Sequence, residues 1–306
     1  MASSSAWPAL EYADWRPTCD TLHAHAQVLG KLAAEMAPPE PQLQHAALRL
    51  TARGWETRLL PAPNSSGGIV AALDLRAHEA VLEHTDGRVR QIRLRPDRPV
   101  GEVTRAVVAA TRELVGAFAF DPTPQEVTWT VPLDEDDEHA RYDPEQVATY
   151  MQAATRAALV LAAFRAPYRG HSTPVNAWWG SFDLAVVLFS GQPAEPPSDD
   201  FLTRNSMDAQ QFALGWWPGD ERYGRAAFFA YAHPAPEGFS DLELSLGGWN
   251  SQLGEYILDV DELRQTRDLH AAALEFGRAV FRHACAVCDW DMGLAATAEG
   301  IPPPIS

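Results

Sequence analysis

Lys31 is the only lysine in the 306-residue chain, and every other member of its 24 Lys and Arg residues is arginine. His23, Gln27 and Lys31 recur every four residues, so on a helix they share one side, next to an apolar stripe. A half-buried lysine in that position can act as a general base, a Schiff-base nucleophile or an anion anchor. His23 and Gln27 would then orient the groups that Lys31 meets. Gly30 lies between them and leaves a bare patch that a ligand or another backbone can approach.

The same three residues also have a purely structural interpretation. Lys31 can sit at the edge of the core and extend its ammonium group to solvent, while His23 and Gln27 cap nearby carbonyl groups. A chain rich in Ala, Arg and Pro with almost no Lys is typical of a GC-rich bacterial genome. Such a composition by itself assigns no function to the one lysine that remains.

A second candidate lies in the segment NAWWGSFDLAVVLFSG, which predicts one strand over residues 177–189. Side chains alternate along a strand, so Trp179, Ser181 and Asp183 share a face that is otherwise apolar. A carboxylate between two apolar faces is partly buried and needs partners or a shifted pKa. Asp183 is therefore a candidate general acid/base or polar anchor in an aromatic-lined cavity. The alternative is that Asp183 holds a turn or pairs with an arginine.

Aromatic and polar residues around these motifs complete the predicted ligand-binding site. Trp179 and Trp216 are candidate walls, because in each Trp-Trp pair one ring points to each face of a strand. His171 and Asn176 precede the Asp183 strand and are candidate rim residues, with Ser181 beside the carboxyl group. Aromatic residues on strands are more often core than pocket, so both roles stay open.

Sequence motifs for metal, redox or nucleotide chemistry are weak or missing. Cys285 and Cys288 have the spacing of half a zinc or redox site, but no second such pair exists and they fall in an apolar helical pattern. The acidic run at 134–139 lacks the regular spacing of a calcium loop. The chain has no P-loop, dinucleotide-binding, nucleophile-elbow or zincin motif. We therefore predict neither a cofactor nor a metal.

The bulk composition limits the partners. A formal charge of −17 without basic clusters disfavours nucleic acids and anionic membrane surfaces. The N-terminal sequence lacks the features of a secretory signal, and no apolar run reaches the length of a membrane span. We expect a cytoplasmic protein with a small-molecule ligand, and a homodimer is left open.

The elements that must position these residues indicate an α+β fold. Helices are predicted over residues 18–36, 100–115, from an Asp143 cap onward, and 268–290. Strands are expected between them, including one at 123–133, and Asp86-Gly87 predicts a hairpin turn. The order helix, strands, helix occurs twice. We therefore expect antiparallel sheets flanked by helices and a pseudo-twofold duplication, with halves 1–140 and 141–306 packed as one globular unit.

The chain resembles a bacterial family known only as domain of unknown function 5996. The resemblance rests on WPALEYADW, TLHAHAQVLGK and WWGSFDLAVVLFSG, and continues through WWPG, FFAYAHPAPEGF and LGEYIL. It covers nearly the whole chain. It implies no activity, since none is assigned to the family.

Two function classes follow from these observations. The first is a cofactor-independent small-molecule enzyme or binding protein that uses Asp183, Lys31 and His23 as acid/base groups in an aromatic-lined pocket. The second is a structural or interaction protein with a Trp-rich contact surface. A cavity with converging polar groups favours the first, and an exposed tryptophan patch without a cavity favours the second.

Overall fold

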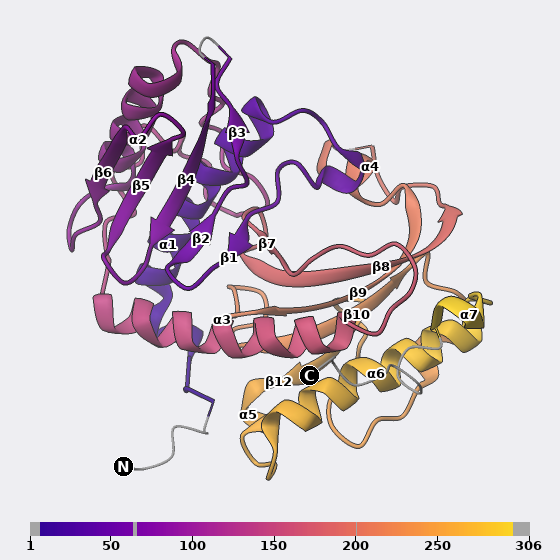
Figure 1. Ribbon diagram of the computed structural model, residues 1–306. Helices are drawn as coiled ribbons and strands as arrows, with labels where there is room; N and C mark the ends of the chain where they lie inside the picture. Colours follow the sequence, from indigo (N-terminus) through magenta and orange to yellow (C-terminus); the bar gives the residue numbers. More distant parts are fainter. Residues whose placement is uncertain (1–6, 64–65, 200, 296–306) are drawn as a thin grey trace, which may run out of the picture.

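The protein has an α+β fold (Figure 1). The computed structural model describes residues 7–63, 66–199 and 201–295. The α-helices are α1 (Tyr12–Met36), α2 (Val100–Val115), α3 (Pro144–Arg165), α4 (Phe201–Ser206), α5 (Val260–Leu263), α6 (Leu269–Val287) and α7 (Met292–Ala295), with two 3-10 turns, η1 (Pro41–Leu43) and η2 (Phe239–Asp241).

The first antiparallel sheet has six strands among the described residues. They are β1 (Arg49–Leu50), β2 (Gly54–Glu56), β3 (Leu60–Pro61), β4 (Gly68–Asp74), β5 (Glu79–His84) and β6 (Val89–Arg93). The order is β1-β2-β4-β5-β6, with β3 on β4. The hairpin predicted at Asp86-Gly87 is confirmed, because it joins β5 to β6 and Gly87 adopts a φ of 93°.

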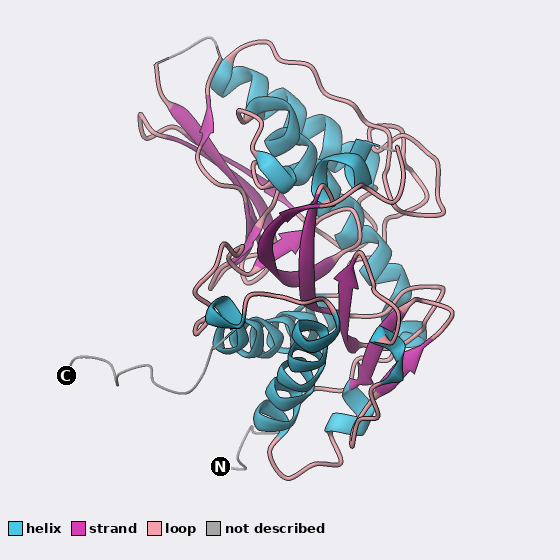
Figure 2. Ribbon diagram, turned by 90° about the vertical axis from the view of Figure 1, so that its right-hand side faces the viewer, coloured by secondary structure: helices cyan, strands magenta, loops and turns pink. Residues whose placement is uncertain are grey.

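The second antiparallel sheet also has six strands in the described part of the chain. They are β7 (Asn176–Trp178), β8 (Asp183–Pro193), β9 (Ala209–Trp217), β10 (Ala227–His233), β11 (Gly248–Asn250) and β12 (Glu255–Asp259). The order is β11-β12-β10-β9-β8-β7. Helices α3 and α6 pack together on one face of its central strands (Figures 1 and 2). The opposite face of β8, β9 and β10 is therefore the one that can form a site.

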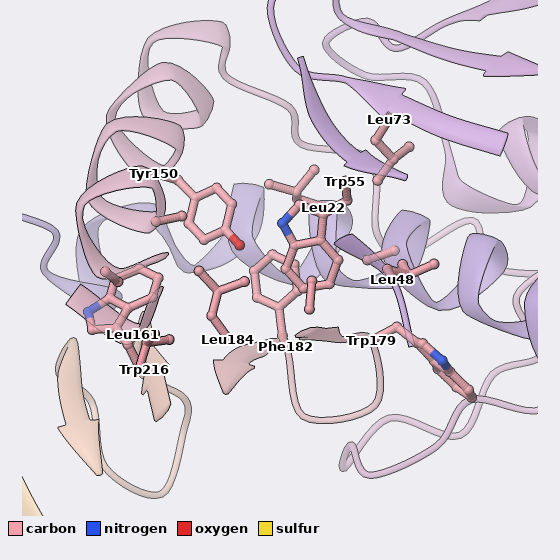
Figure 3. Close-up of a cluster of buried hydrophobic side chains, with 14 of the residues drawn as sticks. Leu22, Leu48, Trp55, Leu73, Tyr150, Leu161, Trp179, Phe182, Leu184 and Trp216 are labelled. Carbon is pink, nitrogen blue, oxygen red and sulfur yellow. The ribbon is translucent and has the colours of Figure 1, made fainter. Parts of the chain in front are cut away.

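One hydrophobic core links the two sheets. It includes Trp15 and Leu29 of α1 together with Leu214 of β9 and Phe281 of α6. Figure 3 shows part of it, where Leu161 of α3 lies close to Trp216 of β9. The pseudo-twofold duplication and the division at residue 140 stay predictions, although each half does contain helix, sheet and helix in the same order.

The long helices begin and end for local reasons that the sequence already carries. The predicted range 100–115 matches α2. The predicted cap of α3 is confirmed, because Asp143 accepts hydrogen bonds from the backbone N–H groups of Glu145 (2.8 Å) and Gln146 (3.3 Å). Helix α1 begins six residues before the predicted start, at Tyr12, because Tyr12 and Trp15 pack into the core. Pro17 lies inside its second turn and cannot donate a backbone hydrogen bond there.

Two strand predictions are wrong. Residues 123–133 form a loop rather than a strand, since two prolines interrupt the segment and Glu126 has a φ of 57°. The segment at 177–189 is not one strand but a hairpin, with β7 ending at Trp178 and β8 beginning at Asp183. The four residues between them form a turn, in which Phe182 has a φ of 59°. This turn changes which tryptophan lies beside Asp183.

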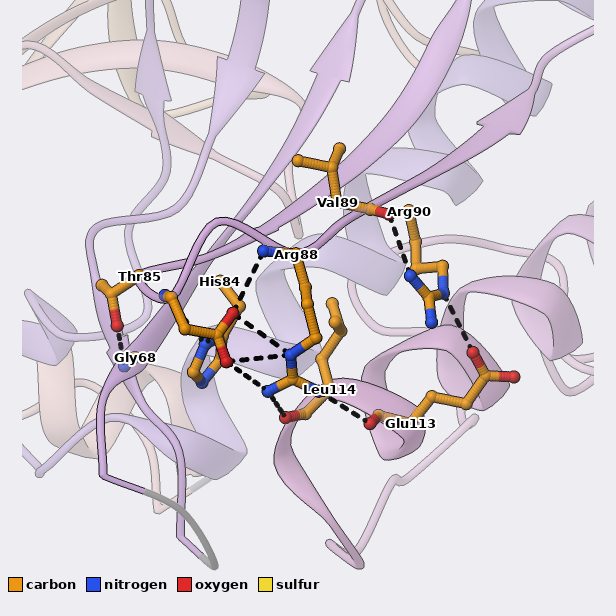
Figure 4. Close-up of polar contacts among 9 residues, drawn as sticks. Gly68, His84, Thr85, Arg88, Val89, Arg90, Glu113 and Leu114 are labelled. Carbon is orange, nitrogen blue, oxygen red and sulfur yellow. Dashed lines mark hydrogen bonds and ion pairs between the residues drawn. The ribbon is translucent and has the colours of Figure 1, made fainter.

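Arg88 joins the first sheet to the end of α2 (Figure 4). Its guanidinium group donates to the carbonyl oxygens of Leu114 (3.1 Å) and Glu113 (3.3 Å), which are among the last carbonyl groups of the helix. Arg90 pairs with the Glu113 carboxylate at 3.0 Å. These contacts fix α2 against the β5–β6 hairpin.

Among the described helices, only α3 is long and apolar enough to cross a membrane by length and composition. A buried core helix passes the same test, and α3 packs against β8, β9 and α6.

Candidate functional site

A cavity of about 920 Å³ lies over the face of the second sheet opposite α3 and α6. Its floor comes from β8, β9, β10 and β12, and its sides come from the second half of α1, residues 42–46 and the loop at 121–126. The ionisable residues along it are Lys31, Glu35, His45, Asp121, Glu126, Asp183, Asp220, Arg222, Tyr223, Tyr231, His233 and Glu255. The cavity thus combines aromatic walls with an excess of carboxyl groups.

Asp183 is the first residue of β8 and lies in the cavity floor. Its side chain shares a face with Ala185 and Val187, and all three line the cavity. Trp178 is the direct cross-strand partner of Asp183, so the two side chains lie on the same face and both line the cavity. Asp183 is only 6% exposed. A carboxyl group is therefore held against an aromatic ring with little access to water.

The surroundings of Asp183 change its protonation. Burial is the largest effect and raises the pKa of Asp183 to about 7, while a hydrogen bond donated by the Ser181 hydroxyl lowers it. The negative charges of Glu126 and Glu255 raise this pKa further. Asp183 is thus poised to donate or accept a proton near neutral pH.

The turn that precedes Asp183 is fixed by stacked aromatic rings. The Phe182 ring lies 4.9 Å from the rings of both His23 and Trp55, and 5.2 Å from the ring of Tyr150. This packing holds Phe182 in its positive-φ conformation, which is unusual for a bulky residue. The turn consequently presents Ser181 and Asp183 in one geometry.

His23 positions this turn and does not line the cavity. Its Nε2 lies 2.9 Å from the carbonyl oxygens of both Trp179 and Gly180. Burial lowers the pKa of His23 to about 4, so the ring is neutral at pH 7 and its Nε2–H donates to these carbonyl groups. The sequence-based expectation made His23 an acid/base group, whereas the structure places it behind the turn, among aromatic rings.

Gln27 holds the loop on the other side of the cavity. Its Nε2 donates to the carbonyl oxygen of Gln125 at 2.8 Å, and its Oε1 accepts from the Gln125 backbone N–H at 2.9 Å. This two-point contact fixes a loop that contributes Asp121, Gln125 and Glu126 to the cavity. Gln27 itself is fully buried and is not part of the lining.

Lys31 lines the same cavity as Asp183. Its ammonium group lies 3.5 Å from the Asp121 carboxylate and 5.7 Å from the centre of the Trp179 ring. Burial is the main influence and lowers the pKa of Lys31, while Asp121 opposes this shift. The lysine side chain is 5% exposed, so it does not extend into solvent.

Trp179 occupies the bare patch at Gly30. A Cβ atom at Gly30 would overlap the indole ring, so only glycine lets the ring lie against α1. The indole Nε1 donates to the carbonyl oxygen of Ala46 at 3.0 Å. The bare patch expected at Gly30 therefore receives a side chain of the protein itself, and Trp179 lines one end of the cavity.

Trp217, and not Trp216, belongs to the cavity lining. Trp216 pairs with Leu184 and Phe228 across the sheet and is fully buried beneath α3. The next residue points to the other face, so Trp217 lies over the cavity beside Phe229, with 5.2 Å between ring centres. The sequence identified the pair, but only the register of β9 decides which ring faces the cavity.

His171 and Asn176 lie outside the lining. His171 is exposed and stacks on Phe189 at 4.7 Å. Asn176 is buried, and its Nδ2 donates to Gln44 Oε1 at 2.9 Å. Both residues help to hold the edge of the second sheet.

Several lining residues lie outside the predicted set of site residues, Glu255 having been only a weaker candidate in the sequence. Glu255 is half-buried on β12, where burial raises its pKa to about 7 and Arg222 lowers it. Gln211 on β9 and Tyr231 on β10 also face the cavity, as does Glu126. Side chains alternate between the two faces along β9, β10 and β12, so the sequence shows which residues of one strand share a face. Which of the two faces lines the cavity can be known only from the strand order of the folded sheet.

The described ranges contain no arrangement of side chains suited to metal binding or thiol chemistry. No group of three or more His, Cys, Asp or Glu residues there is placed to hold a metal ion. Burial raises the pKa of Cys285 to about 12 and that of Cys288 to about 11, which favours the protonated thiols at neutral pH.

The fold and the cavity define an α+β protein with an acidic, aromatic-walled cavity on one face of an antiparallel sheet. The chain belongs to the family of unknown function DUF5996, whose model matches residues 7–297. The comparison with curated proteins yields no match. The comparison with solved structures yields none either.

Proposed function

We propose that this protein binds a small molecule in the cavity over the second sheet and acts on it by acid/base chemistry, without a cofactor. The observation that carries this proposal is the Asp183 carboxyl group, which is buried in the floor of an open cavity with its pKa raised to about 7. A buried carboxyl group without an ion pair destabilises a fold, so its presence in a cavity points to a role beyond packing.

The remaining residues have distinct roles in this proposal. Asp183 donates a proton in its carboxyl form and accepts one in its carboxylate form, and Glu255 is the second group that titrates near neutral pH. Lys31 is paired with Asp121 at 3.5 Å, so we assign it a positioning role at the side of the cavity rather than that of an anion anchor. His23 and Gln27 are positioning residues, because each holds a loop that contributes to the cavity. A cytoplasmic location and a homodimer stay predictions from the sequence.

The alternative is an interaction protein with a Trp-rich contact surface. The large apolar side chains that are exposed in the described ranges are Leu59, Val89 and Leu159. The ten tryptophans all lie within those ranges and are buried or half-buried. The distribution of tryptophan thus supports a cavity more than an exposed patch.

The first test of the proposal is ligand detection by saturation-transfer NMR, using a mixture of cationic, neutral and anionic small molecules. We expect the wild-type protein to bind at least one compound. Trp178→Ala should lose that binding, because Trp178 is a half-buried wall beside Asp183.

Trp249→Ala is the matched control. Trp249 is also half-buried but lies outside this cavity, against Phe239 and Tyr256, so its variant should keep the binding. The proposal is wrong if no compound of any charge binds, or if both variants bind as the wild type does.

A further inference from the structure

The charges along the cavity are unequal. Six carboxyl groups line it, from Glu35, Asp121, Glu126, Asp183, Asp220 and Glu255, against two strong bases. Both bases are already paired, Lys31 with Asp121 at 3.5 Å and Arg222 with Asp220 at 2.7 Å. Within 7–63, 66–199 and 201–295, neither Asp183 nor Glu255 takes part in an ion pair. The two carboxyl groups in the floor thus have no direct ion-pair partner there, although the charge of Arg222 lowers the pKa of Glu255.

Two uncharged acceptors have the same need for a donor. Gln211 is 3% exposed, lines the cavity, and its Oε1 has no hydrogen-bond partner among the described residues. The Oε1 atom of Gln125, on the opposite loop, is likewise buried without a partner there. A buried acceptor without a donor is unfavourable, so both amides favour a ligand that carries N–H groups.

The walls supply aromatic faces. Trp217 lies beside Phe229 and Tyr223, with ring centres 5.2 Å and 5.5 Å away. Phe229 is in turn stacked with Tyr231 at 6.4 Å. Rings of this kind attract cations through their negative faces, and a carboxylate beside them adds a direct ion pair.

We propose that the ligand of this cavity is an organic cation, a protonated amine held by Asp183 and Glu255 and enclosed by Trp178, Trp217 and Phe229. This inference rests on the proposed function and specifies its ligand class. The same geometry disfavours an anion, because binding one would require Lys31 or Arg222 to leave its carboxylate partner.

Proton release is a second consequence of this geometry. The pKa of Asp183 is raised to about 7, so a bound cation that stabilises the carboxylate displaces a proton near neutral pH. The other groups that bear on Asp183 and Glu255 are Glu126 of the loop, Tyr231 of β10, Arg222 and the Ser181 hydroxyl. The affinity for the cation should therefore fall as the pH drops through the pKa of Asp183.

The experiment uses three probes of similar size that share a para-hydroxyphenyl ring and differ in the charge of the group at the end of the side chain. Tyramine carries an ammonium group, tyrosol a hydroxyl group and para-hydroxyphenylacetate a carboxylate. Titration calorimetry at neutral pH is expected to rank tyramine above tyrosol and tyrosol above the acid. The gap between tyramine and tyrosol should be at least about tenfold, as for one charged hydrogen bond. Repeating the titration in buffers of different ionisation enthalpy should show a proton released with tyramine alone.

Asp183→Asn tests the residue that carries the preference. The variant should bind tyramine at least about tenfold more weakly, keep its affinity for tyrosol and release fewer protons than the wild type, since Glu255 still titrates near neutral pH. Glu275→Gln is the control, because it removes one negative charge from an exposed residue of α6 that pairs with Arg282 at 2.6 Å. It should leave all three affinities unchanged.

The outcomes separate this inference from the proposed function. If tyrosol or the acid binds as well as tyramine, the cavity binds small molecules but the organic-cation inference is wrong. If none of the three binds and the broader mixture also fails, both proposals are wrong. An unchanged preference for tyramine in Asp183→Asn would also overturn the inference.

Discussion

At the residue scale, Asp183 carries an energetic cost that the fold does not offset. It is 6% exposed, is hydrogen-bonded by Ser181, and faces the negative charges of Glu126 and Glu255. Groups of this kind gather at functional sites, where stability is given up for chemistry. The pH dependence of stability should reveal it.

We expect Asp183→Asn to stabilise the protein at neutral and higher pH. The folded pKa of about 7 lies above the ordinary aspartate value of 3.8, so the folded state holds its proton more tightly than the unfolded chain. The contribution of Asp183 to stability is therefore largest at low pH and is lost as the pH rises towards 7. The free energy of unfolding of the variant should exceed that of the wild type by on the order of 2 kcal/mol near pH 8, and this difference should shrink towards pH 4.

Urea unfolding of both proteins across this pH range measures the difference. The free energy of unfolding of Glu275→Gln should stay within about 0.5 kcal/mol of the wild-type value at every pH, because the residue is exposed. A variant that is less stable than the wild type at every pH would contradict the buried-carboxyl interpretation.

At the element scale, α1 shapes the cavity through one missing side chain. Trp179 packs against Gly30 and is fixed at its other edge by the bond to Ala46. The same helix presents His23 and Gln27 to the two loops beside the cavity. Helix α1 thus sets the positions of the turn at 179–182, the loop at 121–126 and the Trp179 ring at one end of the cavity.

Gly30→Ala should destabilise the protein by about 1–3 kcal/mol, because the new Cβ atom overlaps the ring of Trp179. Helix propensity alone predicts the opposite, a gain of about 1 kcal/mol for alanine in a helix interior. Urea unfolding at neutral pH gives the sign. Gly248→Ala is the control, since a Cβ atom there meets no heavy atom within 4 Å. If Gly30→Ala is more stable than the wild type, the ring of Trp179 is not held against α1.

At the scale of the whole molecule, the two sheets depend on one core. Helix α1 packs against α2 and β4 and also against α3. The core runs without interruption from Trp15 to Phe281. The two halves expected from the sequence therefore bury apolar surface against each other, and each would expose that surface if it folded alone.

We expect the chain to unfold in a single transition for this reason. Scanning calorimetry should give a calorimetric enthalpy equal to the van't Hoff enthalpy, as in two-state unfolding. Two resolved transitions would mean that the halves are separate folding units.

Local signals determined much of the fold in advance. The period of α2, the Asp143 cap of α3 and the Asp86-Gly87 hairpin depend on near neighbours, and each is confirmed. The loop at 123–133 was misread because β-branched and aromatic residues there resemble a strand, whereas its backbone bonds to Gln27 instead.

The sequence by itself thus determined the four long helices apart from the start of α1, the α+β class and the family resemblance. It also singled out the segments around Lys31 and Asp183, which the structure brings together in one cavity. Only the tertiary structure decided which side chains line that cavity. The turn at 179–182 made Trp178 the neighbour of Asp183, and the register of β9 directed Trp217 to the cavity and Trp216 to the core. The physical reason is that strand pairing is a long-range choice, and a shift of one residue sends every side chain to the other face.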